Sequence, residues 1–290
     1  MKFKKQNLIY GRSMGYEAWQ NFLHNKTGLI GLSILLILIF VAVFADIIAP
    51  YTFDAQDLSR RFYPPSNEYW FGTDNLGRCI FSRVVLGSRY SLVIGMAAAT
   101  ISCLTGTILG SIAGFYSEMT DNIIMRALDL LLALPDILLA ISIIAVLGSG
   151  VENVILAVAI AAVPQYARTI RASVFSIKES EYIEAATCVG SGKLRTMFRH
   201  VLPNCMAPII VTMSLSVSGA ILAASSLSFI GLGIQPPTPE WGAMLSAGRP
   251  FIRESWWIIT FPGLAIMAVI FGLNLLGDAL RDVLDPRLKR

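Results

Sequence analysis

The chain has 290 residues, of which 55% are hydrophobic and only 14% are charged. Soluble domains carry about 25% charged residues, so this composition indicates an integral membrane protein and excludes an ordinary soluble domain. The net charge of +4 comes from basic residues scattered over short segments, which argues against a nucleic-acid partner. Four cysteines without a CxxC pair and only two histidines argue against a disulfide framework, a zinc site or a histidine-based catalytic centre.

The first predicted element is a membrane span. Residues 1–26 are basic, and an uncharged run follows over residues 27–45. This run is close to the ~20 residues that cross a ~30 Å hydrocarbon core. A signal peptide would instead have an apolar region of ~7–15 residues and a small-residue cleavage site. Because this run is longer and ends in Asp46 and Pro50, we predict a retained transmembrane helix over residues 27–49.

A mixed, polar segment over residues 50–90 comes next and is predicted to lie outside the membrane. Residues 91–117 carry no charge, and Gly106, Gly110 and Gly114 repeat within them at every fourth position. Small residues at that spacing allow another helix to approach closely, because lipid offers no hydrophobic drive for helix association. We predict a second span with a glycine face for close packing, the alternative being chance occurrence of glycine in a membrane helix.

Two shorter uncharged stretches follow, over residues 137–151 and 153–167, hinged at Gly148-Ser149-Gly150. At ~1.5 Å per residue, each must draw on flanking residues to span the membrane. This places Asp136 at membrane depth, where an ionisable side chain marks a cavity or a buried partner. Alternatively, Pro135-Asp136 is a helix-start pair whose carboxylate caps free N–H groups. Both interpretations stay open.

A polar stretch over residues 178–204 separates these spans from the next apolar region. Glu181 and Glu184 lie near its start and basic residues near its end, which is the order that the helix dipole favours. Gly190 permits a sharp turn, and Pro203 is expected to end the segment. We predict a polar hairpin consisting of a short helix, a tight turn and a second short helix along the membrane face.

The first helix of this hairpin has apolar residues at helical spacing: Ile183, Ala185, Ala186 and Val189. They face either the ends of the protein's own spans or a partner, and composition favours the first.

Two more spans are predicted near residues 207–227 and 255–277, the last beginning with Trp256-Trp257 at an interface where amphipathic rings prefer to sit. Residues 91–280 therefore form a five-helix core, and the chain is predicted to be an all-α polytopic membrane protein with six transmembrane helices.

Six spans place both ends of the chain on one side of the membrane. The segments on that side hold most of the lysines and arginines, and the positive-inside rule assigns it to the cytoplasm. The N-terminal segment 1–26, the hairpin 178–204 and the basic tail 281–290 are accordingly predicted to be cytoplasmic.

Motifs for catalysis are absent from the sequence. It contains no GxxxxGK[ST], GxSxG or HExxH. An intramembrane aspartyl protease needs two facing carboxylates, whereas Asp129 and Asp136 are predicted on one helix about two turns, ~10 Å, apart. We predict no catalytic site, no bound cofactor and no metal site in this chain.

The polar hairpin resembles a known signature. Glu184-Ala185-Ala186, then Gly190, then His200-Val201-Leu202-Pro203 resembles the EAA-G signature of importer permeases in ATP-binding-cassette (ABC) systems. Generic members have isoleucine where His200 stands, and the run from Arg199 to Asn204 is instead similar to the dipeptide/oligopeptide/nickel branch.

Further segments extend this resemblance over most of the chain: Trp70-Phe71-Gly72-Thr73-Asp74, Gly77-Arg78, Ser82-Arg83, Leu134-Pro135, Tyr166-Ala167-Arg168, Pro236-Pro237-Thr238-Pro239 and Asn274-Leu275-Leu276-Gly277-Asp278. The long segment before the core spans resembles the C-type subunit of that branch. One departure is Cys79, where the branch usually has an acidic residue.

The resemblance implies the type I ABC importer transmembrane fold, in which the hairpin is a coupling helix that docks on a cytoplasmic ATPase. It implies a homologous permease subunit, two ABC ATPase subunits that bind ATP and Mg²⁺, and an external substrate-binding protein, in the bacterial cytoplasmic (inner) membrane. The ligand would be a di- or oligopeptide, or alternatively nickel or a metal chelate. The residues expected to couple to the ATPase are Tyr182, Glu184, Ala185, Ala186, Gly190, Arg199, Leu202 and Pro203.

Two polar residues on the predicted spans are candidates for lining the translocation pathway, Asp136 and Asn274, although interhelical hydrogen bonding is an equal alternative. A rival function class is a secondary transporter or channel with Asp129 or Asp136 as a proton relay. It is disfavoured because the polar hairpin would then have no evident purpose.

Overall fold

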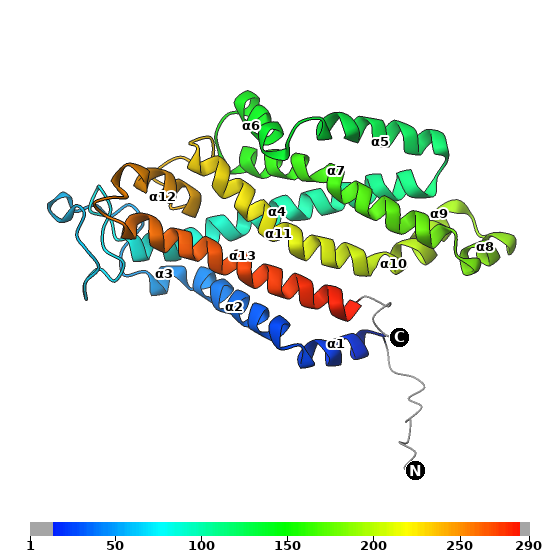
Figure 1. The fold of residues 1–290 in the computed structure, drawn as a ribbon, viewed down its shortest axis with the longest axis horizontal. Coiled ribbons are helices and arrows are strands. Elements are labelled where there is room, and N and C mark those ends of the chain that lie inside the picture. The colour runs from blue at the N-terminus through cyan, green and yellow to red at the C-terminus, as the bar shows by residue number, and fades with distance from the viewer. Residues whose placement is uncertain (1–13, 285–290) are drawn as a thin grey trace, which may run out of the picture.

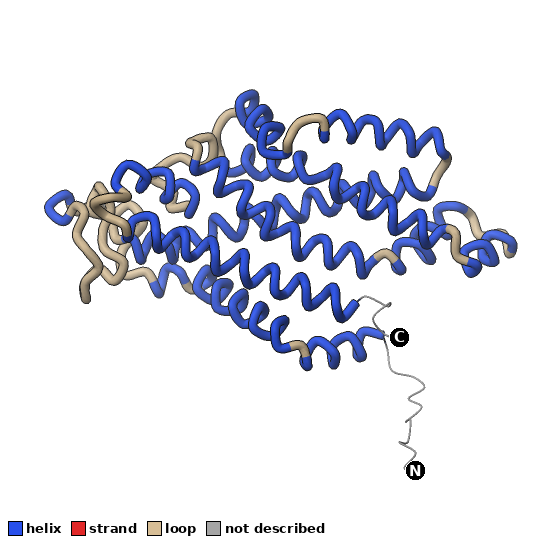
Figure 2. Tube along the Cα trace, viewed as in Figure 1, coloured by secondary structure: helices blue, strands red, loops and turns tan. Residues whose placement is uncertain are grey.

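The computed structural model describes residues 14–284, and within them helices account for every element apart from one isolated bridge between Thr73 and Cys79. Figures 1 and 2 show an elongated bundle. Its α-helices are α1 (Met14–His24), α2 (Lys26–Val43), α3 (Ala45–Ile48), α4 (Ile80–Phe115), α5 (Glu118–Leu132), α6 (Asp136–Leu147), α7 (Val151–Lys178), α8 (Glu181–Cys188), α9 (Lys193–Thr196), α10 (Leu202–Asn204), α11 (Met206–Phe229), α12 (Trp241–Gly248) and α13 (Trp257–Leu284). The predicted N-terminal segment before residue 14 and the tail beyond residue 284 lie outside the described residues.

Five of these helices are long and apolar enough to cross a membrane: α2, α4, α7, α11 and α13. Helices α5 and α6 meet the same criterion only together, and they are bent by 85° at the break between them. Counting this broken pair as one span gives six, the number expected from the sequence.

Helix α4 begins at Ile80, well before the uncharged run that starts at residue 91. Its first turns carry charge, but the charges are partnered. Arg83 is buried and donates hydrogen bonds to the backbone oxygens of Phe53, at 2.6 Å, and Pro237, at 3.2 Å. Burial against loops from two other parts of the chain explains why charge alone misplaced this helix start.

Cys79 is the N-cap residue of α4, and its side chain makes no capping hydrogen bond. A carboxylate caps a helix by accepting from its first free N–H groups. Cys79 therefore leaves the start of α4 without a side-chain cap.

The break between α5 and α6 corrects the expectation that Asp129 and Asp136 share one helix. Leu134 precedes Pro135, and the proline ring disfavours helical backbone at the residue before it. Asp129 consequently stays on α5, whereas Asp136 begins α6. The predicted hinge at Gly148-Ser149-Gly150 does separate α6 from α7, and Gly148 has the left-handed φ of +88°.

Helices α4 and α7 pack closely along the predicted glycine face. A Cβ atom built on Gly106 would lie 2.3 Å from the Cβ of Tyr166, and one built on Gly110 would lie 2.4 Å from the backbone oxygen of Ala167. Both distances are far below van der Waals contact, so only glycine fits. The close helix approach predicted from the glycine spacing is confirmed.

The two ends of the bundle differ. The loop of residues 50–79 and α12 lie at one end, and α8 and α9 lie at the opposite end, together with α1 and the last turns of α13 (Figure 1). A large apolar core runs through α4, α7, α11 and α13, and a smaller cluster lies beneath the hairpin.

Candidate functional site

The polar hairpin forms as the sequence predicts, and a glycine closes its first helix. Gly190 has φ +91° and follows α8. The N–H of Gly190 donates to the oxygen of Thr187 at 2.9 Å, and the N–H of Ser191 donates to the oxygen of Ala186 at 3.0 Å. This pair of bonds is the Schellman arrangement, which satisfies the last carbonyl groups of a helix. No atom lies within 4 Å of a Cβ built on Gly190, so the requirement for glycine is conformational.

One side of the hairpin is anchored to the bundle. Ile183 is only 4% exposed and packs in a cluster with Phe115, Val174, Met197 and Val201. The predicted contact of α8 with the protein's own spans is thus made by Ile183.

Three other apolar residues of the hairpin's first leg face outward. Tyr182 is 47% exposed and Val189 is 90% exposed, and Ala185 between them is exposed as well. These positions are spaced by three and four residues, so they share one face of α8. The second leg leaves Leu194 and Phe198 about 60% exposed. We call these five residues the hairpin face. Exposed apolar groups gathered in this way mark a surface for a partner.

The remaining predicted coupling residues divide between the surface and the interior. Glu184, Arg199 and Pro203 are exposed, Ala186 is half-buried, and Leu202 is half-buried against the cluster that holds Ile183. Glu184 also lines a hollow of about 500 Å³ between the hairpin and the ends of α4 and α7.

Pro203 does not end the second leg. A π-helical turn at Met197–Val201 leads into α10, where Pro203 lies in the first turn, and α11 starts after a single break at Cys205. The backbone stays helical through this region, since the Leu202 N–H donates to the Met197 oxygen, and Pro203 lacks only its own N–H.

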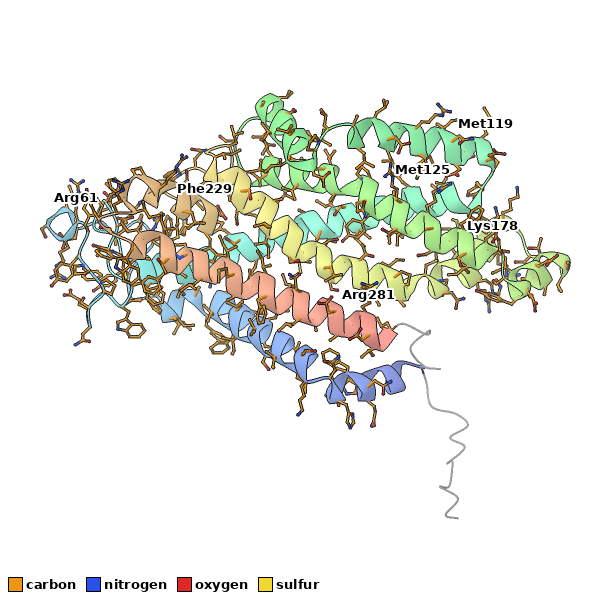
Figure 3. The ribbon with its side chains drawn as sticks, viewed as in Figure 1. Arg61, Met119, Met125, Lys178, Phe229 and Arg281 are labelled. Atoms are coloured by element: carbon orange, nitrogen blue, oxygen red, sulfur yellow. The ribbon has the colours of Figure 1, made fainter. Side chains whose placement is uncertain are left out.

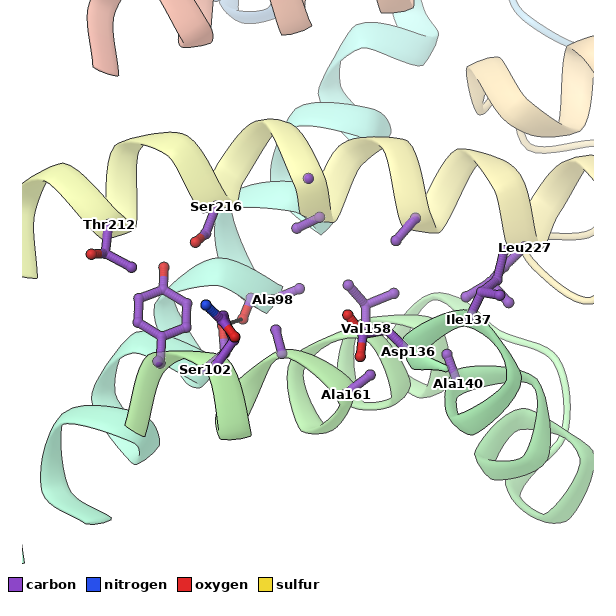
Figure 4. Close-up of a pocket in the computed structure, with 16 residues that line it drawn as sticks. Ala98, Ser102, Asp136, Ile137, Ala140, Val158, Ala161, Thr212, Ser216 and Leu227 are labelled. Atoms are coloured by element: carbon purple, nitrogen blue, oxygen red, sulfur yellow. Dashed lines mark hydrogen bonds between the residues drawn. The ribbon is translucent and has the colours of Figure 1, made fainter. Parts of the chain in front are cut away.

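A cavity of about 290 Å³ lies among α4, α6, α7 and α11 (Figure 4). Small side chains form most of its wall, which creates the space. Its lining residues are Ala98, Ser102, Asp136, Ile137, Ala140, Val158, Ala161, Ala162, Gln165, Tyr166, Thr212, Ser216, Gly219, Ala220, Ala223 and Leu227. Asp136 is the charged member of this set.

The two pathway candidates lie in different environments. Asp136 lines the cavity, is exposed, and makes no hydrogen bond or ion pair with the residues of the described part of the chain. The helix-capping alternative for its carboxylate therefore has no hydrogen bond to support it. Asn274 does not line the cavity: its Oδ1 accepts a 2.8 Å hydrogen bond from Ser218 Oγ, which joins α13 to α11. This contact is an interhelical hydrogen bond, the role that the sequence offered as the alternative to lining the pathway.

Sequence reasoning missed two ion pairs that join α5 to α7. Arg168 donates to Asp129 at 2.5 Å, and Arg171 donates through two nitrogens to both carboxylate oxygens of Asp121. Met125 faces α7, whereas Met119 on the same helix points away from the bundle (Figure 3). The amphipathic spacing of α5 and the presence of arginines on α7 were the features of the sequence from which these ion pairs could have been predicted.

Comparisons with known proteins agree with this geometry. Residues 106–290, more than half of the chain, match the family model described as the binding-protein-dependent transport system inner membrane component. Residues 13–65 match the N-terminal transmembrane domain of oligopeptide transport permease C.

Several curated relatives are similar over nearly the whole chain. The di/tripeptide transport system permease protein DppC of Pseudomonas aeruginosa is 47% identical, with 94% of this chain and 92% of that protein covered. The dipeptide transport system permease protein DppC of Alkalihalophilus pseudofirmus is 46% identical, with 94% and 90% covered. The glutathione transport system permease protein GsiD of Pectobacterium atrosepticum is 43% identical, with 94% and 91% covered.

A solved structure supports the fold. An inward-facing MetNI methionine ABC transporter chain superimposes with a TM-score of 0.59 at 14% identity, covering 69% of this chain and 96% of that chain. This chain is a multi-pass membrane protein with the fold of an ABC importer transmembrane subunit. It belongs to the family of binding-protein-dependent transport system inner membrane components, the permease subunits of ABC importers.

Proposed function

We propose that this chain is the permease subunit of an ATP-driven importer of di- or oligopeptides. The names of its relatives support this substrate class, since they transport dipeptides, di- and tripeptides, or glutathione, which is itself a small peptide. Nickel or a metal chelate is the weaker alternative. Residues 14–284 contain no group of three His, Cys, Asp or Glu side chains that could hold a metal ion.

The hairpin face is the proposed ATPase contact. The observation that carries this assignment is the division within α8, where Ile183 anchors the helix to the bundle while Tyr182, Ala185 and Val189 stay exposed. A short helix held in this way moves together with the spans beneath it. In this role, Glu184 and Arg199 offer charges to the ATPase beside the apolar contact, and Gly190, Ala186, Leu202 and Pro203 shape the hairpin.

The importer needs further subunits. A homologous permease would cover the exposed bend at residues 133–138 and close the open side of the cavity. Two ATPase subunits would bind ATP and Mg²⁺ and dock on the two hairpins, while an external binding protein delivers the peptide. The chain itself would catalyse no reaction and bind no cofactor.

In this mechanism, ATP closes the ATPase pair, the docked hairpins move, and the spans change from an inward to an outward opening. The hairpin and both chain ends would then lie in the cytoplasm of a bacterial inner membrane. Asp136 would line the pathway through the cavity, and Asn274 would join two of its helices.

The rival class, a proton-driven transporter, has less support. Asp129, one of its two candidate relay groups, is held by Arg168. This ion pair joins α5 to α7, which gives Asp129 a structural role.

Purification and uptake separate the two classes. We expect the tagged chain to co-purify with a stoichiometric ATPase, and peptide uptake to stop when ATP is depleted while persisting after an uncoupler is added. Uptake that survives ATP depletion and stops with the uncoupler would overturn the proposal.

A further inference from the structure

Asp136 is a carboxylate without a partner in a cavity of small side chains. It is the first residue of α6, it lines the cavity, and no residue of the described range 14–284 bonds to it. In Figure 4 its side chain extends among the lining residues. An ionised group on a membrane-spanning element is costly and marks a functional site. A cationic group that enters the cavity would remove much of that cost.

The neutral polar groups of the cavity suit an amide-containing ligand. Gln165 brings a side-chain amide that no described residue pairs with, and the buried Tyr166 hydroxyl lies beside the Ser216 hydroxyl without a well-aligned hydrogen bond within residues 14–284. Ser216, on the facing helix α11, adds a hydroxyl group. Such groups donate to and accept from a peptide bond.

The charged residues that line the cavity determine whether a cationic or an anionic ligand is favoured. No lysine, arginine or histidine is among the residues that line the cavity. Residues 14–284 bring no three His, Cys, Asp or Glu side chains together for a metal ion, and Asp136 is a single carboxylate in this lining. An organic ammonium group needs only one carboxylate and a few neutral acceptors.

We propose that the cavity is a subsite for the peptide in transit, in which the carboxylate of Asp136 receives its α-ammonium group. This proposal rests on the proposed peptide-import function. Because no residue that lines the cavity supplies a cation for the peptide's carboxylate, the selectivity of this cavity concerns the amino end alone. Blocking the amino end should weaken binding, whereas blocking the carboxyl end should not.

The test uses the purified permease–ATPase complex without its binding protein, so that only the transmembrane site is probed. Equilibrium binding is measured with radiolabelled Ala-Ala, N-acetyl-Ala-Ala and Ala-Ala-amide. We expect N-acetylation to weaken binding about 10- to 100-fold, the range of a hydrogen-bonded charge pair, and amidation to leave it within about twofold.

Variants assign the effect to the carboxylate. Asp136→Asn should weaken Ala-Ala binding about 10-fold or more while leaving N-acetyl-Ala-Ala unchanged, and Asp136→Glu should retain part of the preference. Glu118→Gln is the matched control, since Glu118 is an exposed carboxylate on the same broken span and outside the cavity. Its binding profile should equal that of the unsubstituted chain.

Three outcomes overturn the subsite: Asp136→Asn that keeps the preference for a free amino end, equal loss of both peptides, or loss of Ni²⁺ binding without loss of Ala-Ala binding. ATP-driven uptake by the unsubstituted complex is measured in parallel. If that uptake fails to depend on ATP, the importer proposal is wrong. If it depends on ATP while Asp136→Asn behaves like the unsubstituted complex, only the subsite is wrong.

Discussion

At the scale of single residues, glycines serve two separate purposes in this chain. Gly110 provides space, because a Cβ there would meet the backbone of α7, whereas Gly190 provides a left-handed turn in open surroundings. Glycine is therefore required by close packing in a span and by backbone conformation in the hairpin.

Gly190→Leu should uncouple transport while leaving the complex assembled. A side chain at φ +91° costs about 1–2 kcal/mol, which the exposed hairpin would avoid by changing its turn and displacing Val189. The measurement is ATP hydrolysed per peptide imported in proteoliposomes, which we expect to rise several-fold.

Gly192→Leu is the control for this variant. Gly192 has an ordinary φ of −67° and no atom within 4 Å of a built Cβ, so a side chain is accommodated. Normal coupling by Gly190→Leu, or equal damage from both variants, would contradict a specific role for the Gly190 turn.

The helical hairpin could be predicted from the sequence, but which of its apolar residues are buried and which are exposed could not. Helical spacing placed Ile183, Ala185 and Val189 on one short helix, and only the packed structure shows that Ile183 is buried while Ala185 and Val189 are exposed. Which face a short helix buries depends on the spans beneath it, and these contacts come from distant parts of the sequence.

At the scale of elements, hydropathy located the spans α2, α11 and α13 well, because few charges interrupt them. It placed the start of α4 too late and missed the break between α5 and α6. Arg83 lies inside α4 because distant loops bind it, and two carboxylates of α5, Asp121 and Asp129, pair with arginines of α7. A charged residue with a partner can lie inside a membrane helix, so the position of a charge does not by itself mark the end of the helix.

Exchanging the acidic and basic residues of an ion pair between α5 and α7 should preserve the pair. Asp121→Arg or Arg171→Asp alone leaves like charges facing each other, and the two together restore an opposite pair. We expect a coupling energy of about 1–2 kcal/mol in a double-mutant cycle of thermal unfolding, because the pair is bidentate and partly buried.

The corresponding swap at Asp129 and Arg168 is the comparison. That pair is about half exposed, so its coupling energy should stay below about 1 kcal/mol. A double variant at Asp121 and Arg171 that is no more stable than the worse single variant would show that the pair does not hold α5 on α7.

At the scale of the whole molecule, orientation can be tested with the native cysteines. Cys79, Cys103 and Cys205 are buried, and Cys188 on the hairpin is exposed, so a thiol reagent reports on one position. We expect a membrane-impermeant maleimide to label Cys188 in inside-out vesicles and not in right-side-out vesicles, and docking of the ATPase to slow the labelling.

The complementary probe is Asn67→Cys in a Cys188→Ser background, because Asn67 is exposed in the loop at the opposite end. It should be labelled in right-side-out vesicles alone. The reverse pattern at both positions would place the hairpin outside the cell and remove the basis for an ATPase contact.

The broken span formed by α5 and α6 also bears on how the protein is made in the cell. Its bend leaves residues 133–138 exposed, and backbone groups that lack helical partners are costly against lipid. A freshly inserted copy with no companion subunit therefore presents a defect that membrane proteases can recognise. We expect a pulse-chase of the chain produced alone to show rapid degradation, and co-production of its companion permease to extend its lifetime, so that the scarcer gene product sets the number of finished transporters.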